Sequence, residues 1–360
     1  MRYFITGLLL GIALGFAPWL MPHHSFKLYP QWHGTISGAQ SIDPSPFAPG
    51  SDALIGPVEK ENGYYLFRDN GELAASPGAD SNIISPSGNG EYYVEYGKLS
   101  TEISYCNYRG EPFWAMSTRE YPHLSYGGKL VLLVTADNSS VRMVDYNGNA
   151  TGTRKIGGRF CTTIGFSRPG NAASLGFMDG SFYFLNATGK ITHKGKTPGN
   201  ALVKTTGISS NAQYGAVHAG SPGKDGDVLL LLDIEDEDSF TTPVKGISRA
   251  RASMAVNDDG TAAFLGMSHI YFLNINSEKH KPVKIPERRE GHSSIQYSDN
   301  LYIITYTEKN GTSRFYIFHE NGDVLFTRVY PDEPFMDVMV RGQSILLRGS
   351  DSLYCYSYQI

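Results

Sequence analysis

The sequence predicts an all-β fold made of short repeated units, and three observations support this prediction. Forty of the 360 residues are glycine, above the usual ~7%. Tyrosine and phenylalanine are abundant, with 23 and 18 residues, whereas charged residues make up only 18% of the chain, against a usual ~25%. A strand-and-turn pattern also recurs about every forty residues. Glycine-rich turns between aromatic segments are typical of sheets, and a repeat of this length indicates a solenoid, propeller or array.

One repeated segment is an aromatic or aliphatic strand followed by a polar turn, usually with Gly or Asn. Its copies begin at Gly63, Glu102, Ser140, Gly180, Asp227, His269, Ser313 and Asp351. The second residues of these copies, at positions 64, 103, 141, 181, 228, 270, 314 and 352, are 39, 38, 40, 47, 42, 44 and 38 residues apart. The chain therefore holds eight copies of this strand.

A second signature recurs at the same period, as two apolar strands joined by a polar turn. The turns lie at Ser85, Ser125, Ser167, Ser209, Asn257, Ser298 and Arg341. With the strand described above and a further strand after it, each period holds four strands. Helical repeats are disfavoured because the segments are rich in Val, Ile, Tyr and Phe, with turn residues every 8 to 12 positions.

Four antiparallel strands per repeat correspond to one blade of a β-propeller. A lone four-stranded sheet cannot bury both faces, but sheets packed face to face in a ring can. We therefore expect a single propeller over residues 51–360. The strand pairs count seven blades, which is the expected number. The eight third strands, with residues 53–58 (ALIGPV) as an extra strand, leave eight blades as the alternative.

The last repeat ends at its third strand, at Ile360. An N-terminal strand is therefore expected to complete the last blade and to close the ring.

The N-terminal segment differs from the rest of the chain. Arg2 is followed by an uncharged run from Tyr3 to Met21, long enough for a helix to cross a bilayer. Residues 1–22 are thus expected to be a signal or a membrane anchor, with a linker over residues 23–50. Ala13 and Gly15 form a poor cleavage pair, which favours an uncleaved anchor over a removed signal. The positive N-terminal end predicts that the propeller is extracytoplasmic, in the periplasm or at the cell surface.

Parts of the repeat resemble known families. FYFLNATGKI at Phe182–Ile191 is similar to the strand-turn unit of PQQ-like propellers, and SPSGN from Ser85 and NDDGTAAF from Asn257 are similar to turns of WD40-like exported propellers. The resemblance covers nearly all of residues 50–360 as a pattern. It implies a propeller and, by analogy with scaffold propellers of outer-membrane assembly, a binding role. It carries over no cofactor and no catalytic residue, because regularly spaced docking tryptophans are absent.

No motif for chemistry stands out. The chain has no P-loop, nucleophile elbow or H-E-x-x-H sequence, so no catalytic residue, cofactor or metal is expected. A formal charge of -4 gives no basic field for nucleic acid. The acidic run from Asp233 to Asp238 is interpreted as a charged turn, with a calcium site as the alternative. Cys106, Cys161 and Cys355 are expected to be buried thiols.

Arginines gather in the predicted links between the fourth strand of one blade and the first strand of the next. Such links lie on one face of a propeller around its channel, and arginine suits the recognition of carboxylate or phosphate. We expect this face to bind an anionic ligand or an acidic partner surface. The candidate residues are Arg119, Arg159, Arg249, Arg251, Arg288, Arg289 and His292.

The function expected from the sequence is that of a membrane-anchored scaffold that binds proteins of the cell envelope. Propellers present a broad and rigid face with loops. The alternative is an exported propeller enzyme, such as a lyase, a hydrolase or a quinone-dependent dehydrogenase. An enzyme would concentrate histidine and carboxylate side chains with perturbed pKa values in the channel mouth, whereas a scaffold would show a flat apolar or charged patch.

Overall fold

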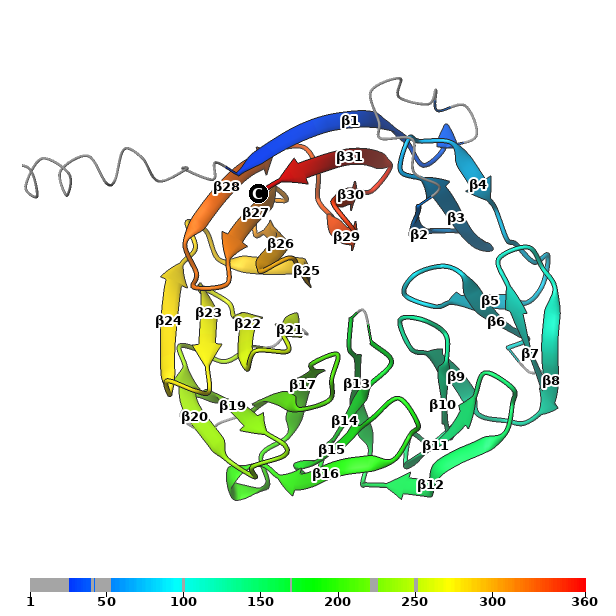
Figure 1. Cartoon of the computed structure of the whole chain (residues 1–360), viewed down its shortest axis with the longest axis horizontal. Helices are drawn as coiled ribbons and strands as arrows, with labels where there is room; N and C mark the ends of the chain where they lie inside the picture. The colour runs from blue at the N-terminus through cyan, green and yellow to red at the C-terminus, as the bar shows by residue number, and fades with distance from the viewer. Residues whose placement is uncertain are drawn as a thin grey trace, which may run out of the picture.

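Eight antiparallel sheets stand around a central axis (Figure 1). The computed structural model describes residues 26–39, 42, 53–98, 101–168, 170–220, 226–248 and 252–360. The segment expected to be an anchor or signal, residues 1–22, lies outside them. None of the helices within the described residues is long and apolar enough to cross a membrane. The chain is a single β-propeller.

The blades follow one another along the chain, and their strands are called A to D from the channel outward. Blade 1 contains β2 (Leu54–Lys60), β3 (Gly63–Arg68) and β4 (Leu73–Ala75). Blade 2 contains β5 (Ile83–Pro86), β6 (Tyr92–Tyr96), β7 (Glu102–Asn107) and β8 (Pro112–Ser117). Blade 3 contains β9 (Tyr121–Leu124), β10 (Leu130–Val134), β11 (Ser140–Asp145) and β12 (Ala150–Gly157). Blade 4 contains β13 (Cys161–Phe166), β14 (Ala173–Phe177), β15 (Ser181–Leu185) and β16 (Ile191–Lys196).

The second half of the ring repeats this order. Blade 5 contains β17 (Val203–Ile208), β18 (Tyr214–Ala219), β19 (Asp227–Asp233) and β20 (Ser239–Val244). Blade 6 contains β21 (Met254–Val256), β22 (Thr261–Leu265), β23 (His269–Asn274) and β24 (Lys279–Lys284). Blade 7 contains β25 (Arg289–Ser298), β26 (Leu301–Glu308), β27 (Ser313–His319) and β28 (Val324–Tyr330). Blade 8 contains β29 (Asp337–Arg341), β30 (Ser344–Arg348), β31 (Ser352–Gln359) and the N-terminal β1 (Lys27–Thr35).

The expected number of seven blades is wrong, because the ring has eight. Seven of the eight predicted third strands are C strands of four-stranded blades, and the eighth is β3, the middle strand of blade 1. The seven predicted turns join A and B strands. The missing blade is blade 1, which has three strands within the described residues. Its weak segment ALIGPV forms β2 and pairs with β3, but it is not preceded by the strand and polar turn that marked the other blades.

The ring closes through the two ends of the chain. β1 pairs antiparallel with β31, from Lys27 opposite Gln359 to Thr35 opposite Ser352. Trp32 on β1 is 8% exposed, packs against Phe67 of blade 1 and donates its indole N–H to the Asp69 carbonyl at 2.8 Å. The predicted closing strand is confirmed, and it occupies part of the segment expected to be a linker.

A repeated hydrogen bond explains the repeated serines of the A–B turns. The hydroxyl oxygens of Ser125, Ser167 and Ser209 accept the backbone N–H five residues later, at 2.9 to 3.0 Å. Ser87 does the same in blade 2, and in blade 6 Asn257 accepts the N–H of Thr261 at 2.7 Å. Each side chain thus supplies a partner that the turn backbone lacks. Because the same hydrogen bond recurs in the same turn of several blades, the same kind of residue recurs there, and the repeat can be recognised in the sequence.

Apolar side chains fill the spaces between neighbouring blades. Leu130 and Leu132 of blade 3 share one cluster with Leu175 and Phe177 of blade 4, and all four are fully buried. Equivalent clusters join the later blades. The three cysteines are buried thiols, as expected. The packed sheets therefore form a rigid framework that supports the loops at both faces.

Candidate binding faces and the central channel

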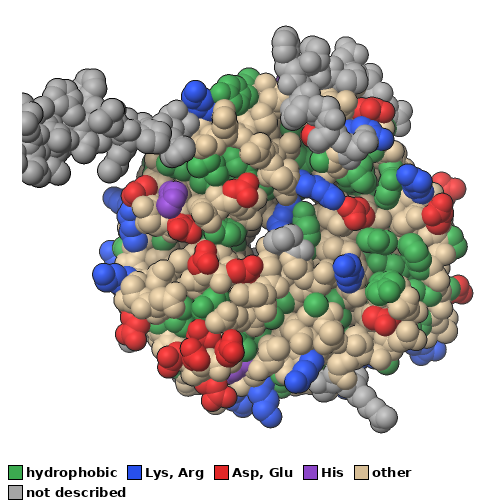
Figure 2. Space-filling view, in the orientation of Figure 1, with side chains coloured by type: hydrophobic (Ala, Val, Ile, Leu, Met, Phe, Trp, Pro, Cys, Tyr) green, Lys and Arg blue, Asp and Glu red, His purple; other side chains and the backbone are tan. Residues whose placement is uncertain are grey.

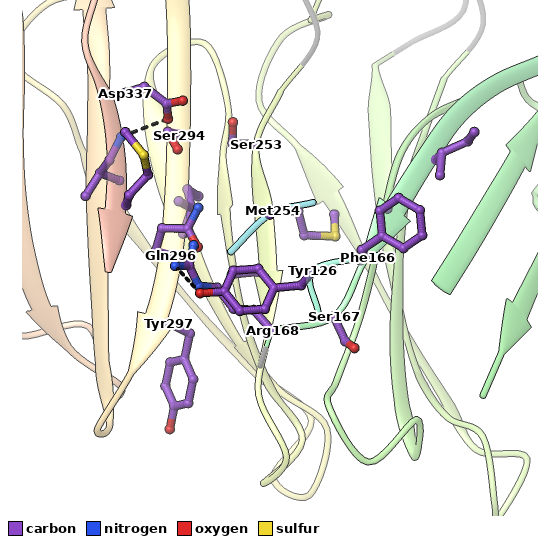
Figure 3. A pocket seen from close by; sticks show the side chains of 18 of the residues that line it. Tyr126, Phe166, Ser167, Arg168, Ser253, Met254, Ser294, Gln296, Tyr297 and Asp337 are labelled. Atoms are coloured by element: carbon purple, nitrogen blue, oxygen red, sulfur yellow. Dashed lines mark hydrogen bonds between the residues drawn. The ribbon is translucent and has the colours of Figure 1, made fainter. Parts of the chain in front are cut away.

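The two faces of the propeller and its central channel are the candidate sites for binding a ligand or a partner protein. The upper face is defined here by the links from one blade to the next and by the B–C turns. The lower face is defined by the A–B and C–D turns. The channel between them is a cavity of about 760 Å³ lined by residues of all eight blades. Figure 3 shows some of these side chains, with Asp337 and Ser294 near the upper end and Tyr297 near the lower end.

Arg168 forms a bridge across the channel. It lies in the A–B turn of blade 4 and donates from Nη1 to Oε1 of Gln296 in blade 7 at 2.5 Å. Its Nη2 donates to the hydroxyl of Tyr126 in blade 3 at 2.7 Å and to the carbonyl of Val340 in blade 8. The guanidinium also lies 4.2 Å from the centre of the Tyr126 ring. One side chain thus ties together four blades (Figure 3).

The upper mouth of the channel holds a second group of polar side chains. His292 of β25 stacks on Phe335 with ring centres 4.3 Å apart, and its Nε2 lies 3.7 Å from Oδ1 of Asp337. Burial would raise the pKa of Asp337, but hydrogen bonds from His292 and Ser294 outweigh burial and hold this pKa below its usual value. The Asp337 carboxylate is therefore charged at neutral pH.

Arg348 completes the upper mouth. Its guanidinium lies 5.1 Å from the centre of the Phe335 ring, and its Nε is buried without a hydrogen-bond partner among the described residues. A guanidinium at a cavity wall with an unused donor is suited to accept a carboxylate from outside.

The arginines predicted from the links occupy three kinds of position. Arg119, Arg159 and Arg288 are exposed on the upper face. Arg249 and Arg251 lie outside the described residues. Arg289 is 0% exposed. His292 lines the channel rather than the outer surface of the face. The structure therefore places three of the seven candidates on the exposed face and one at the channel mouth.

Arg289 is a structural residue and does not belong to the exposed surface. Its guanidinium donates to the carbonyls of Gly266 and Gly291, both at 3.3 Å, and to the hydroxyl of Ser248 at 3.3 Å. Burial lowers its pKa to about 10, so it still carries a charge at neutral pH. A link sequence does not reveal which of its side chains turn inward, so the burial of this residue could not be foreseen.

A buried charged network adjoins Arg289 and was not foreseen. Asp227 accepts from Nζ of Lys204 at 2.6 Å and from the backbone N–H of Ser248 at 2.9 Å, and its other contact is Nε2 of His218 at 2.9 Å. His218 is 0% exposed. Each of these residues comes from a different segment of blade 5 or the link after it, so no sequence motif marks them.

Exposed apolar side chains accompany the arginines on the upper face. Tyr121 is 44% exposed, Phe160 39% and Met178 45%. Phe160 and Met178 are direct neighbours, since the Met178 N–H donates to the Phe160 carbonyl at 2.8 Å. Aromatic residues, methionine and arginine are the types enriched in protein–protein interfaces. The upper face therefore has the composition of a protein-binding surface.

Within the described residues, no group of three or more His, Cys, Asp or Glu side chains converges as metal ligands do. The run from Asp233 to Asp238 forms the C–D turn of blade 5, where Asp233 accepts the backbone N–H groups of Glu235 and Asp236. This arrangement corresponds to the charged turn of the sequence prediction.

Comparisons with known proteins relate this chain to others by fold. No protein-family model and no curated protein sequence matches the chain. Among solved structures, BamB from Moraxella catarrhalis is similar, with a TM-score of 0.59 and 13% identity over 92% of this chain and 100% of that chain. The shared feature is the β-propeller. A chain in a crystal structure of the mitotic checkpoint complex has a TM-score of 0.51 and 13% identity, over 77% of this chain and 86% of that one.

Proposed function

We propose that this chain is a scaffold that binds a protein partner with an acidic surface through its upper face. The observation that carries this proposal is the combination of Arg119, Arg159 and Arg288 with exposed Tyr121 and Phe160 on one rigid face. Interface cores use such aromatic side chains as anchors, and arginine fixes the register through bidentate contacts. Arg348 at the channel mouth has a donor, Nε, that no acceptor among the described residues uses and that a partner carboxylate could engage.

The proposed place of action is the cell envelope, with residues 3–21 as the membrane anchor. This part rests on the uncharged run that follows Arg2 and on the length that a bilayer requires. A scaffold tethered in this way would present its rigid face to envelope proteins.

Site-specific crosslinking in intact cells tests the upper face. A photo-reactive residue at Phe160 should give a discrete adduct with one partner, and the same residue at Val324, which is 51% exposed on the outer strand β28, should not. The triple variant Arg119→Glu, Arg159→Glu, Arg288→Glu should abolish the Phe160 adduct. The control variant Lys129→Glu, Lys190→Glu, Lys194→Glu makes the same charge change outside the upper face and should leave it intact. An adduct unaffected by the arginine variant would refute the proposed docking face.

A further inference from the structure

The lower face carries an unusual concentration of carboxylates over blades 5 to 7. Eight exposed acidic residues lie in four turns of these blades, and no lysine or arginine lies in those turns. The acidic sector is defined by these residues: Glu235, Asp236, Glu237, Asp238, Asp258, Asp259, Glu278 and Asp299. Figure 2 shows this face, with acidic side chains gathered at its lower left over the fifth and sixth blades.

The carboxylates of the acidic sector are not neutralised within the described residues. None of the eight forms an ion pair there, although Lys279 begins the strand next to one turn. Their field reaches Tyr214, since burial first and then Asp233, Asp236 and Asp259 raise the pKa of its phenol. Like charges on one rigid surface repel one another, and a cationic partner would relieve this repulsion.

A cavity beside the acidic sector gives this surface a defined centre. The lower mouth of the channel is a cavity of about 550 Å³ lined by Asp258, Asp259 and Asp299 together with Asn257 and Arg341. Asn257 is 2% exposed, and its Nδ2 makes no hydrogen bond of normal length and angle among the described residues, although it lies close enough to the Tyr297 hydroxyl to lower the pKa of that phenol. Nη1 of Arg341 is likewise buried without a partner, while Nη2 donates to Glu91 at 2.5 Å. Buried donors without acceptors are costly, so the mouth offers two donors for incoming carbonyl oxygens.

The occupant that fits these features is an extended basic peptide. A metal ion does not fit, because within the described residues the carboxylates are spread over several turns and no three of them converge on one point. Nucleic acid and anionic lipid surfaces would be repelled. A peptide brings cationic side chains for the carboxylates and main-chain carbonyls for the buried donors, at about 3.3 Å per residue.

We propose that the acidic sector and the adjoining mouth bind an extended segment of a partner protein that is rich in lysine and arginine. The carboxylates contact its cationic side chains, and Nδ2 of Asn257 donates to a main-chain carbonyl. This site lies on the face opposite to the docking surface of the proposed function, so either can fail without the other. Together they would let the scaffold hold an acidic partner on one face and a basic one on the other.

Fluorescence anisotropy with the purified full-length chain tests the site. The probe is a labelled peptide of alternating arginine and serine, compared with one of alternating glutamine and serine. The variant Asp258→Asn, Asp259→Asn, Asp299→Asn keeps every side chain's shape and should weaken binding of the arginine peptide about tenfold at low salt. The glutamine peptide should bind neither protein.

A matched control removes the same charge elsewhere. The variant Glu287→Gln, Glu290→Gln, Asp332→Asn changes exposed residues of two links and of the start of β25 at the upper face, and should change the affinity less than about twofold. Equal weakening by both variants would overturn the proposal, because it would show attraction by net charge alone. Displacement of the peptide by about 1 mM Ca²⁺ but not by Mg²⁺ would overturn it in favour of a metal site.

Asn257→Asp separates carbonyl recognition from charge attraction. The change adds a carboxylate and removes the Nδ2 donor, while Oδ1 can still accept the N–H groups of Asp259 and Thr261. Spermine, which is cationic but has no carbonyl groups, should bind more tightly to this variant, and the arginine peptide should not. Equal tightening of both probes would refute the assigned role of Asn257.

Discussion

Two arginines in the same channel have different environments, and their roles differ accordingly. Arg168 donates to three partners from blades 3, 7 and 8, whereas Arg348 contacts one ring and its Nε has no hydrogen-bond partner within the described residues. The partners of Arg168 lie 42 to 172 residues away in the sequence. Arg168 does not stand out in the sequence, because a contact across a ring leaves no local pattern.

Removing the bridge should destabilise the ring. Arg168→Ala leaves the carbonyl of Val340 and the side chains of Gln296 and Tyr126 without this donor, at an expected cost of about 2–3 kcal/mol in the free energy of unfolding. Arg168→Lys should recover only part of this loss, because an ammonium group lacks the planar fork. Arg348→Ala is the control and should cost less than about 1 kcal/mol. Urea titration measures all three, and equal losses for both alanine variants would contradict the bridge.

The buried network around His218 should make stability depend on pH. Burial lowers the pKa of His218 in spite of its contact with Asp227, so the folded state binds fewer protons than the unfolded state, whose histidine pKa is about 6.5. Stability from this group is therefore fully present above about pH 6.5 and falls as the pH drops towards the folded-state pKa. His218→Asn should reduce the loss of unfolding free energy between pH 7.5 and pH 5 by about 1–2 kcal/mol.

The control for this pH effect is His280→Asn, since His280 is exposed on β24. The pH dependence of this variant is the reference for the removal of one exposed imidazole. His193 and His269 also have lowered pKa values, through burial. They therefore contribute to the pH dependence of the unfolding free energy in every variant. A slope unaffected by His218→Asn would contradict the assignment.

Strands and turns could be predicted from the sequence where the same side-chain hydrogen bond to the turn backbone recurs from blade to blade. The C strands end in turns whose Asn or Asp side chain accepts N–H groups two and four residues later, as Asn107, Asp145 and Asn186 do at 2.9 to 3.1 Å. Those residues make each copy recognisable. β1 carries no such turn and contains Pro30, so its existence followed only from the unfinished last blade. Blade 1 was missed as a full unit because it lacks the A–B turn signature.

Trp32 should account for much of the stability of ring closure. Trp32→Ala removes an indole packed on Phe67 and its hydrogen bond to the Asp69 carbonyl, and should lower the free energy of unfolding by about 3–5 kcal/mol. Tyr29→Ala changes an aromatic residue of the same strand that is 43% exposed, and should cost less than about 1 kcal/mol. Guanidinium titration compares them. Similar losses would show that the strand pairing, rather than the indole, holds the two ends together.

The upper and lower faces of the propeller carry different kinds of side chains, and the rigid ring keeps the two faces apart. Arginines and exposed aromatic side chains lie on the upper face, and the lower face carries carboxylates that form no ion pair within the part of the chain that the structure describes. The sequence indicated the arginine-bearing links because a propeller brings all such links to one face. It did not indicate the acidic sector, because three of its four turns hold only one or two carboxylates each. These turns form a single surface only in the folded ring, where blades 5, 6 and 7 are neighbours.

Cell fractionation tests the proposed anchor. The full-length chain should sediment with membranes and resist extraction at alkaline pH, because a 19-residue apolar run is long enough to span the hydrocarbon core. A variant without residues 1–22 should be released into the soluble fraction when expressed in the same cells. Release of the full-length chain by alkaline extraction would rule out a membrane-spanning anchor.

The closing strand has a mechanical consequence. Any tension applied to the chain before Lys27 enters the ring through β1, whose sheet partner is β31. Pulling β1 along its own axis loads many of its hydrogen bonds at once, which resists sliding, whereas peeling it away from the Lys27 end breaks them one at a time. Above a threshold force blade 8 should open at this seam, between β1 and β31, before any other pair of neighbouring strands separates.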